Sequence, residues 1–259
     1  MKKKTNIWVK SWRPLLILVF LFMIWEVAVR LSQTPAWLLP APSVIFIEAF
    51  RGFHNIVPDL LSTTSIAVLG FTLGATIGLV VAFFLHLIPF LREVTYPLLI
   101  LSQNVPIIVL APLLVIWFGF GLLPKMIVIT LVCFFPITVA ALDGLRQTPK
   151  ELSHYMAMAG ASKLQMFWKL ELPHSIPSIF SGLKISATYS VMGAVISEWL
   201  GAKQGIGVYM TLASSSFRTD RVFVAIFIIM LLSLLFFAII VVFEKWLVRW
   251  QKQGEQNNG

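Results

Sequence analysis

The chain has 259 residues, of which 58% are hydrophobic and only 12% charged, and its mean hydropathy is +0.89. About a quarter of the residues of a soluble domain are charged, so this composition excludes an ordinary soluble protein and indicates an integral membrane protein. The formal net charge of +9 could suggest nucleic-acid binding, but in a membrane protein it is typical of basic residues gathered in cytoplasmic loops.

The N-terminal residues include several lysines, followed by an apolar run that is too long for a signal peptide and lacks a small-residue cleavage site. We therefore predict an uncleaved first membrane span over about Leu15–Leu31. Glu26 and Arg30 lie four residues apart near its end, where they can pair on one helix face. At roughly 20 residues per span, the chain has room for five or six such helices.

The next segment, Pro35–Pro58, is rich in proline and is predicted to be a loop, with Trp37 as an interfacial anchor. Within it, Ser43–Phe53 has the pattern of a short amphipathic helix at the membrane interface. Span 2 is predicted over about Ser62–Leu85. It carries three glycines at four-residue spacing, which favour close helix packing over a substrate groove: Gly70, Gly74 and Gly78.

Span 3 is predicted over about Tyr96–Phe118 and is expected to be broken by its three prolines, Pro97, Pro106 and Pro112. Near its middle lie Gln103 and Asn104, whose amide side chains are not expected to face lipid. They could hydrogen-bond to other helices or line a solute path, and the sequence leaves both alternatives open.

Three further spans are predicted over about Lys125–Leu142, Ser178–Trp199 and Val222–Val242. Small and hydroxyl-bearing residues of span 5, including Ser186 and Ser190, fall close to one helix face. Such a stripe forms either a tight helix interface or the wall of a pathway.

Glu198, at the other end of span 5 from Lys184, is a further solute-pathway candidate. A carboxylate so close to the membrane interface could serve transport or could simply be solvated.

Between spans 4 and 5, the charged interval Thr148–Pro173 is punctuated like two short helices. Thr148 is expected to be the N-cap of the first helix, in a capping box with Glu151, and Gly160 is expected to end it in a left-handed conformation. Ser162 and Gln165 repeat the box for the second helix, which Pro173 is expected to stop. An element of this kind is more than a connection requires and indicates a docking site for another protein.

Basic residues concentrate before Pro14, in the loop between spans 4 and 5, and after Glu244. The positive-inside rule therefore predicts that both termini and this loop are cytoplasmic. We expect an all-α, polytopic protein in a bacterial cytoplasmic membrane. Its predicted parts are an N-terminal tail with the first span and outer amphipathic segment (residues 1–55), a transmembrane domain (56–245) containing a cytoplasmic loop (146–173), and a C-terminal tail (246–259).

The sequence lacks the common signatures of enzymes and metal sites. It contains no G-x-x-x-x-G-K-[ST], H-E-x-x-H or G-x-S-x-G motif, its four histidines are scattered, and Cys133 is its single cysteine. We therefore expect no catalytic residue, no metal site and no cofactor bound by this chain. An arginine ladder for voltage sensing and a potassium-filter motif are also missing.

The stretch Met158–Pro173, M-A-G-A-S-K-L-Q-M-F-W-K-L-E-L-P, resembles the cytoplasmic loop of binding-protein-dependent ABC importer permeases. The pattern of that family is E-A-A, three residues, Gly, nine residues, Ile, one residue and Leu-Pro. Aligning its glycine with Gly160 places Leu170 at the Ile position and keeps the spacing intact. The E-A-A positions fall on His154, Tyr155 and Met156, where this sequence departs from the pattern.

Other stretches resemble the branch of that family that imports nitrate, sulfonates, taurine and thiamine-precursor pyrimidines. They are P-I-I-V-L-A-P-L-L-V-I-W-F-G-F-G from Pro106, P-S-I-F-S-G-L from Pro177, and E-W-L-G-A-K-Q-G-I-G from Glu198. The resemblance covers most of the chain and implies a type I ABC importer transmembrane domain. It further implies a homodimer of permeases, two cytoplasmic ATPase subunits that bind ATP, and an extracytoplasmic solute-binding protein.

In such a permease the loop would couple to the ATPase. Residues assigned to this coupling are His154, Tyr155, Met156, Met158, Gly160, Ala161, Leu164, Phe167, Trp168, Leu170 and Pro173. The methionines and aromatic residues among them would offer an adaptable apolar face to a groove on the ATPase. The expected solute is a hydroxymethylpyrimidine-type thiamine precursor or an aliphatic sulfonate, and the alternative function is an ATP-independent channel or secondary transporter.

Overall fold

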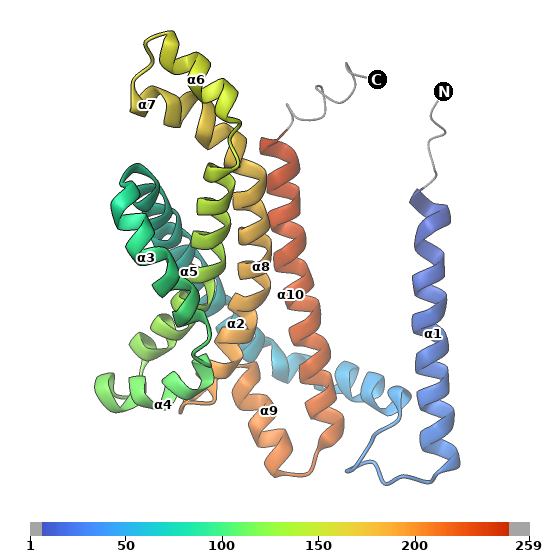
Figure 1. Ribbon diagram of the computed structural model, residues 1–259. Helices are drawn as coiled ribbons and strands as arrows, with labels where there is room; N and C mark the ends of the chain where they lie inside the picture. Colours follow the sequence, from blue (N-terminus) through green and yellow to red (C-terminus); the bar gives the residue numbers. More distant parts are fainter. Residues whose placement is uncertain (1–6, 249–259) are drawn as a thin grey trace. The chain divides into compact units, whose positions relative to one another are not determined.

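The structure is a computed structural model that describes residues 7–248, with side chains from Trp12 to Val248, and within this range it contains helices and no strand (Figure 1). The all-α fold is therefore confirmed. The lysines before Ile7 and the C-terminal tail from Arg249 onward, on which part of the topology prediction depends, lie outside the described residues.

The helices follow one another with short connections. In chain order they are α1 (Ile7–Leu31), α2 (Pro42–Leu87), α3 (Pro89–Gln103), α4 (Ile107–Phe118), α5 (Leu122–Arg146), α6 (Lys150–Met158), α7 (Lys163–Met166), the π-helical turn η1 (Phe167–Glu171), α8 (Leu172–Glu198), α9 (Ile206–Ser215) and α10 (Thr219–Leu247). Five of the helical segments are long and apolar enough to cross a membrane, and the bent pair α3–α4 makes a sixth if it is counted as one span. The prediction of about six spans is confirmed.

The described chain divides into two compact units. One comprises the residues up to Val57 together with Tyr209–Ile228, and the other comprises Pro58–Val208 together with the residues from Ile229 onward. The second unit contains the loop between spans 4 and 5 and the helices that would line a solute path. We refer to it as the transmembrane core.

Helix α2 differs from the prediction because it joins two elements that the sequence analysis separated. The amphipathic stretch Ser43–Phe53 and span 2 are parts of one helix of 46 residues, in which Pro58 is an interior residue. A proline inside a helix removes one backbone hydrogen bond, yet α2 continues through Pro58.

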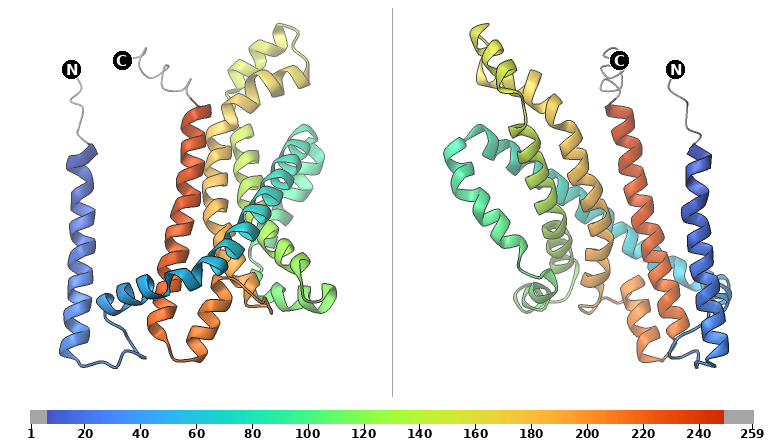
Figure 2. Two further views of the ribbon diagram at one scale, coloured as in Figure 1. Left: turned by 180° about the vertical axis from the view of Figure 1, so that it is seen from behind. Right: turned by 45° about the vertical axis from the view of Figure 1, so that its right-hand side comes forward.

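Span 3 is broken as predicted, but at one proline and not at three. Helices α3 and α4 meet at an angle of 96° across a short break at Asn104–Pro106. Pro106 is the N-cap of α4, with an extended backbone, whereas Pro97 and Pro112 lie inside helices. In the transmembrane core, α4 lies at the opposite end from α6 and α7 (Figure 2).

The three glycines of α2 bring its backbone against α5. A methyl group added at Gly74 would lie 2.6 Å from the Cβ of Cys133, and one at Gly78 would lie 3.1 Å from the carbonyl oxygen of Phe134. The structure thus agrees with the interpretation of these glycines as packing residues. Gly182 of α8 likewise approaches the Cβ of Ala140 on α5.

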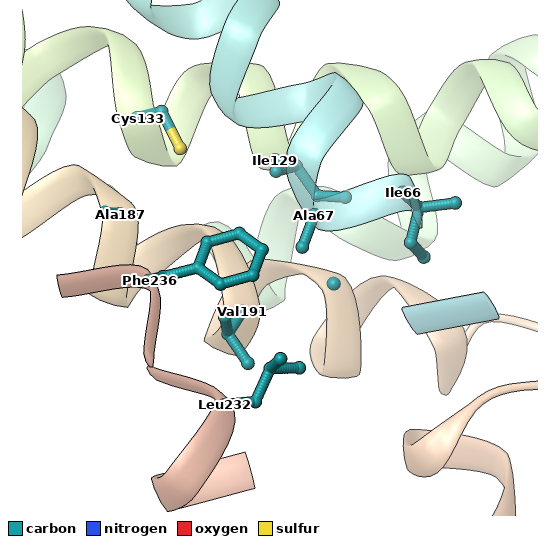
Figure 3. Packing of buried hydrophobic residues seen from close by; sticks show 9 residues of the cluster. Ile66, Ala67, Ile129, Cys133, Ala187, Val191, Leu232 and Phe236 are labelled. Carbon is teal, nitrogen blue, oxygen red and sulfur yellow. The ribbon is translucent and has the colours of Figure 1, made fainter. Parts of the chain in front are cut away.

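A hydrophobic cluster holds four helices of the transmembrane core together (Figure 3). Its buried members come from α2, α5, α8 and the later part of α10: Ile66, Ala67, Ile129, Cys133, Ala187, Val191, Ala194, Leu232 and Phe236. This packing fixes the positions of α5 and α8, which carry the loop between them.

In the other unit, α1 packs against the first turns of α10 through aromatic rings. The rings of Trp25 and Phe223 lie 5.2 Å apart. The predicted Glu26–Arg30 pair forms at 2.6 Å, and Glu26 also accepts a hydrogen bond from the backbone amide of Ser43. Trp37 is exposed, and its carbonyl accepts a hydrogen bond from Thr219.

Candidate functional site

Loop 146–173 forms the helix–glycine–helix element that the sequence predicts. Gly160, between α6 and α7, has a φ of +81°, the left-handed conformation expected of it. Ser162 caps α7 in a complete capping box: its hydroxyl accepts a hydrogen bond from the amide of Gln165 at 3.3 Å, and its own amide donates to the Gln165 side chain at 2.8 Å. The second capping box is therefore confirmed.

Two details of the loop were predicted wrongly. The N-cap of α6 is Pro149 without a side-chain bond, since the Thr148 hydroxyl donates to the carbonyl of Leu145 at the end of α5. Pro173 does not stop the second helix, because η1 leads directly into α8. Pro173 occupies the first turn of α8, where a missing amide hydrogen is tolerated.

Most residues assigned to ATPase coupling are accessible on loop 146–173. The exposed ones are His154, Tyr155, Met158, Gly160, Leu164 and Trp168, and the partly buried ones are Met156, Ala161, Leu170 and Pro173. Met158 is 81% exposed, a high value for a large apolar residue. Exposed apolar side chains of this size are typical of a protein interface.

Phe167 is the exception among the assigned residues. It is only 3% exposed, and its ring packs edge-on against Phe83 of α2 with centroids 5.5 Å apart. Beside it, Nε2 of His86 lies 2.8 Å from the carboxylate of Glu171. Phe167 therefore belongs to the attachment of the loop to α2 and not to the surface that a partner could contact.

A cavity of about 790 Å³ lies beside the break between α3 and α4. Its walls come from that break and from α5 and α8, and they are largely apolar. The polar side chains among them belong to Ser102, Gln103 and Tyr189. A mostly apolar cavity with a few polar groups is typical of a site for a small organic molecule.

Of the residues assigned to a solute path, Gln103 lines this cavity and Asn104 does not. The Asn104 amide instead donates to the carbonyl of Ile100 at 3.1 Å. Ser186 and Ser190 are fully buried between helices. The Ser186 hydroxyl donates to the carbonyl of Cys133 on α5 at 2.9 Å, so this stripe forms a tight interface.

The face of α8 that lines the cavity was missed by the sequence analysis. It consists of Tyr189, Met192 and Ile196, which lie at helical spacing beside the small-residue stripe. The small-residue stripe could have indicated this face. Once the small residues pack against another helix, the larger residues on the neighbouring face remain free to border a cavity.

Glu198 is 1% exposed and is held by hydrogen bonds within the transmembrane core. Its carboxylate accepts hydrogen bonds from the hydroxyl of Thr63 and from the backbone amide of Gly207, both at 2.7 Å. The Thr63 hydroxyl in turn accepts from the amide of Ile206 at 2.8 Å. The interpretation of Glu198 as a solvated group is therefore wrong, and Glu198 is not among the residues that line the cavity.

The arrangement places the Glu198 carboxylate on the Gly207 amide in the first turn of α9. The positive end of the helix dipole favours an anionic group there, and burial strengthens each of these hydrogen bonds. Asp59 adds a parallel contact, since its carboxylate accepts from the amide of Gly205 at 2.8 Å. Two residues of α2 and one of α8 thus fix the Trp199–Gly207 connection.

The described residues contain no group of three or more His, Cys, Asp or Glu side chains that could hold a metal ion. What the core does present is an apolar cavity, an exposed apolar loop at one end, and a hydrogen-bonded connection at the other.

Comparison with known proteins finds transport permeases of similar sequence. The chain is 35% identical over 241 residues to the formylaminopyrimidine transport permease protein ThiX of Halalkalibacterium halodurans, covering 93% of this chain and 96% of the relative. It is 28% identical over 252 residues to the putative aliphatic sulfonates transport permease protein SsuC of Bacillus subtilis, covering 96% of this chain and 90% of the relative.

Among solved structures, an amino acid ABC transporter crystallised with histidines resembles the fold, with a TM-score of 0.64 at 15% identity over 77% of this chain and 97% of that one. The sequence pattern of one protein family matches residues 74–249. The chain belongs to this family, the binding-protein-dependent transport system inner membrane components.

Proposed function

We propose that this chain is the permease subunit of an ATP-driven importer and forms the solute path across the cytoplasmic membrane. The observation that carries the proposal is loop 146–173, which presents exposed apolar side chains such as Met158 and Trp168 on a rigidly capped element. A separate ATPase subunit would bind this surface as a helix-in-groove contact and would supply the ATP hydrolysis.

The proposed complex contains two copies of this chain, two ATPase subunits and an extracytoplasmic solute-binding protein. Both termini and loop 146–173 would then face the cytoplasm. The membership of the family and the positive-inside pattern of the basic residues support this orientation.

The proposed solute is a thiamine-precursor pyrimidine of the hydroxymethylpyrimidine type. The cavity supports a neutral heteroaromatic solute, because its lining residues among those described carry no formal charge and include Gln103 and Tyr189 as hydrogen-bonding groups. The similarity to a formylaminopyrimidine permease points to the same class. An aliphatic sulfonate remains the second candidate, supported by the similarity to a sulfonate permease.

Reconstitution of the complex in liposomes tests both parts of the proposal. We expect radiolabelled hydroxymethylpyrimidine to enter only when the binding protein and ATP are present. Excess unlabelled pyrimidine should compete, whereas excess ethanesulfonate should not. Competition by the sulfonate alone would show that the solute is a sulfonate and not a pyrimidine. Uptake without any ATPase would show that the protein is a channel or secondary transporter.

A further inference from the structure

We propose that the part of α2 from Asp59 to Leu87 is a rod that transmits movement of loop 146–173 to the Trp199–Gly207 connection at the opposite end of the permease. The inference rests on the proposed function, because the movement would originate in the ATPase. It assigns a positioning role to His86, Phe167 and Glu171, which contact neither solute nor nucleotide.

At the loop end, the rod is fastened by one buried ring and one polar link. Phe167 inserts against Phe83 and lies 6.0 Å from the His86 ring, centroid to centroid. The His86 Nε2 donates to Glu171, and among the described residues Nδ1 has no partner, so the link passes through Nε2 alone. Phe167 and Glu171 are the two ends of η1, so this turn cannot move without pulling on α2.

Between its ends the rod is continuous. Residues 59–87 contain no proline and form an unbroken part of α2. From His86 to Thr63 the helix rises about 35 Å at 1.5 Å per residue, enough to cross the hydrocarbon core of a bilayer. The glycines of α2 that face α5 let the backbone of α2 pack closely along α5.

At the opposite end, the rod is fastened to the connection between α8 and α9. Thr63 bonds both the Glu198 carboxylate and the Ile206 amide, and Asp59 bonds the Gly205 amide. The Gly205 and Ile206 amides lie directly before and in the first turn of α9, and Glu198 is the last residue of α8. A shift of α2 along its axis would therefore break or drag this set of bonds, and contiguous packed and hydrogen-bonded groups of this kind can carry coupling between distant sites.

A labelling experiment on the complex of permease and ATPase in nanodiscs tests the rod. A Lys203→Cys substitution places a thiol on the exposed part of the connection, and the native Cys133 is buried, so the parent chain gives the background rate. A non-hydrolysable ATP analogue should change the rate at which a maleimide reacts with this thiol.

His86→Ala should reduce that nucleotide-dependent change at least about fivefold, within the range of coupling between separate sites. His86→Gln should preserve it, because the amide nitrogen can still donate to Glu171. The matched control is His174→Ala, which removes an exposed imidazole one turn beyond Glu171. Melting temperature and nucleotide binding should stay close to those of the parent, which separates transmission from folding.

Phe167→Leu provides a second test if His86→Ala does not assemble. It keeps an apolar side chain in the site, loses the ring contacts with Phe83 and His86, and should weaken the response in the same way. A full response in either assembled variant overturns the rod. Failure of the parent complex to respond to the nucleotide overturns the proposed function instead, and the rod with it.

Discussion

Glu198 is buried because the connection that follows it brings glycine backbone against its carboxylate. Gly205 has a φ of +134°, and a methyl group there would collide with the carboxylate of Glu198. Gly160 also has a positive φ, but a methyl group there would meet no atom within 4 Å. Substitution of Gly160 would therefore introduce backbone strain alone, whereas substitution of Gly205 would introduce both backbone strain and a steric clash.

We predict that Gly205→Ala destabilises the permease more than Gly160→Ala. Both variants suffer strain of about 1 kcal/mol or more from a left-handed backbone, and only the first also displaces a buried carboxylate from its donors, at a further cost of about 1–3 kcal/mol. Thermal unfolding in detergent measures the difference. Equal melting temperatures for the two variants would contradict the assignment of Glu198 as a buried anchor.

Residue type alone did not reveal this anchor. A carboxylate near the end of an apolar helix can be solvated, can serve transport or can be buried, and the choice depends on whether Thr63 and Asp59 come close. Those residues lie more than a hundred positions away in the sequence. The same applies to Ser186 and Ser190, because a stripe of small hydroxyl-bearing residues has the same sequence pattern whether it packs on α5 or borders water.

At the scale of elements, loop 146–173 has two faces with different roles. Met158 and Trp168 are exposed, whereas Phe167 is buried against α2. Consecutive residues such as Phe167 and Trp168 point in different directions because each step around a helical turn is a large rotation. The sequence identifies all three as candidates for coupling. It cannot show which are exposed and which are buried, because the π-helical turn changes the direction in which successive side chains point.

We predict opposite effects for substitutions on the two faces. Met158→Glu should leave the permease folded while reducing binding of the ATPase about tenfold or more, as loss of a central apolar contact does. Phe167→Ala should lower thermal stability by about 3–5 kcal/mol because it empties a packed site. Co-purification with the ATPase and thermal unfolding distinguish the two; weak ATPase binding with full stability in Phe167→Ala would reverse the assignment.

Hydropathy predicts most of the helices but not how they join. The spans are found because each is an apolar run, and a break in span 3 is found because it contains prolines, although the sequence did not single out Pro106 among the three. The continuity of α2 through Pro58, the passage from η1 into α8 and the separate helix α9 depend on contacts with other parts of the chain. Local sequence carries too little of that information.

At the scale of the molecule, the cavity beside α3 and α4 is the proposed route of the solute. We predict that Met192→Trp, which fills this cavity, reduces pyrimidine uptake by about tenfold, equivalent to ~1.4 kcal/mol in the barrier. ATP hydrolysis should continue, because the loop is unchanged. Uptake by reconstituted liposomes, with ATP hydrolysis measured in parallel, gives the result.

The control for this substitution is Met230→Trp on α10. Met192 and Met230 are 48% and 47% exposed, but only Met192 borders the cavity. The control should therefore import pyrimidine at the parental rate. Equal loss in both variants would mean that the added bulk disturbs the helices in general and that the cavity is not the route.

The uninterrupted helix between Asp59 and His86 has a consequence for how this protein family can vary. Each inserted or deleted residue turns everything beyond it by about 100° around the axis and shifts it by about 1.5 Å. A single deletion would leave the segment as hydrophobic as before, yet would point the His86 imidazole away from the Glu171 carboxylate. Family members that keep both anchor points should therefore vary in the amino-acid sequence of this stretch but agree in its length.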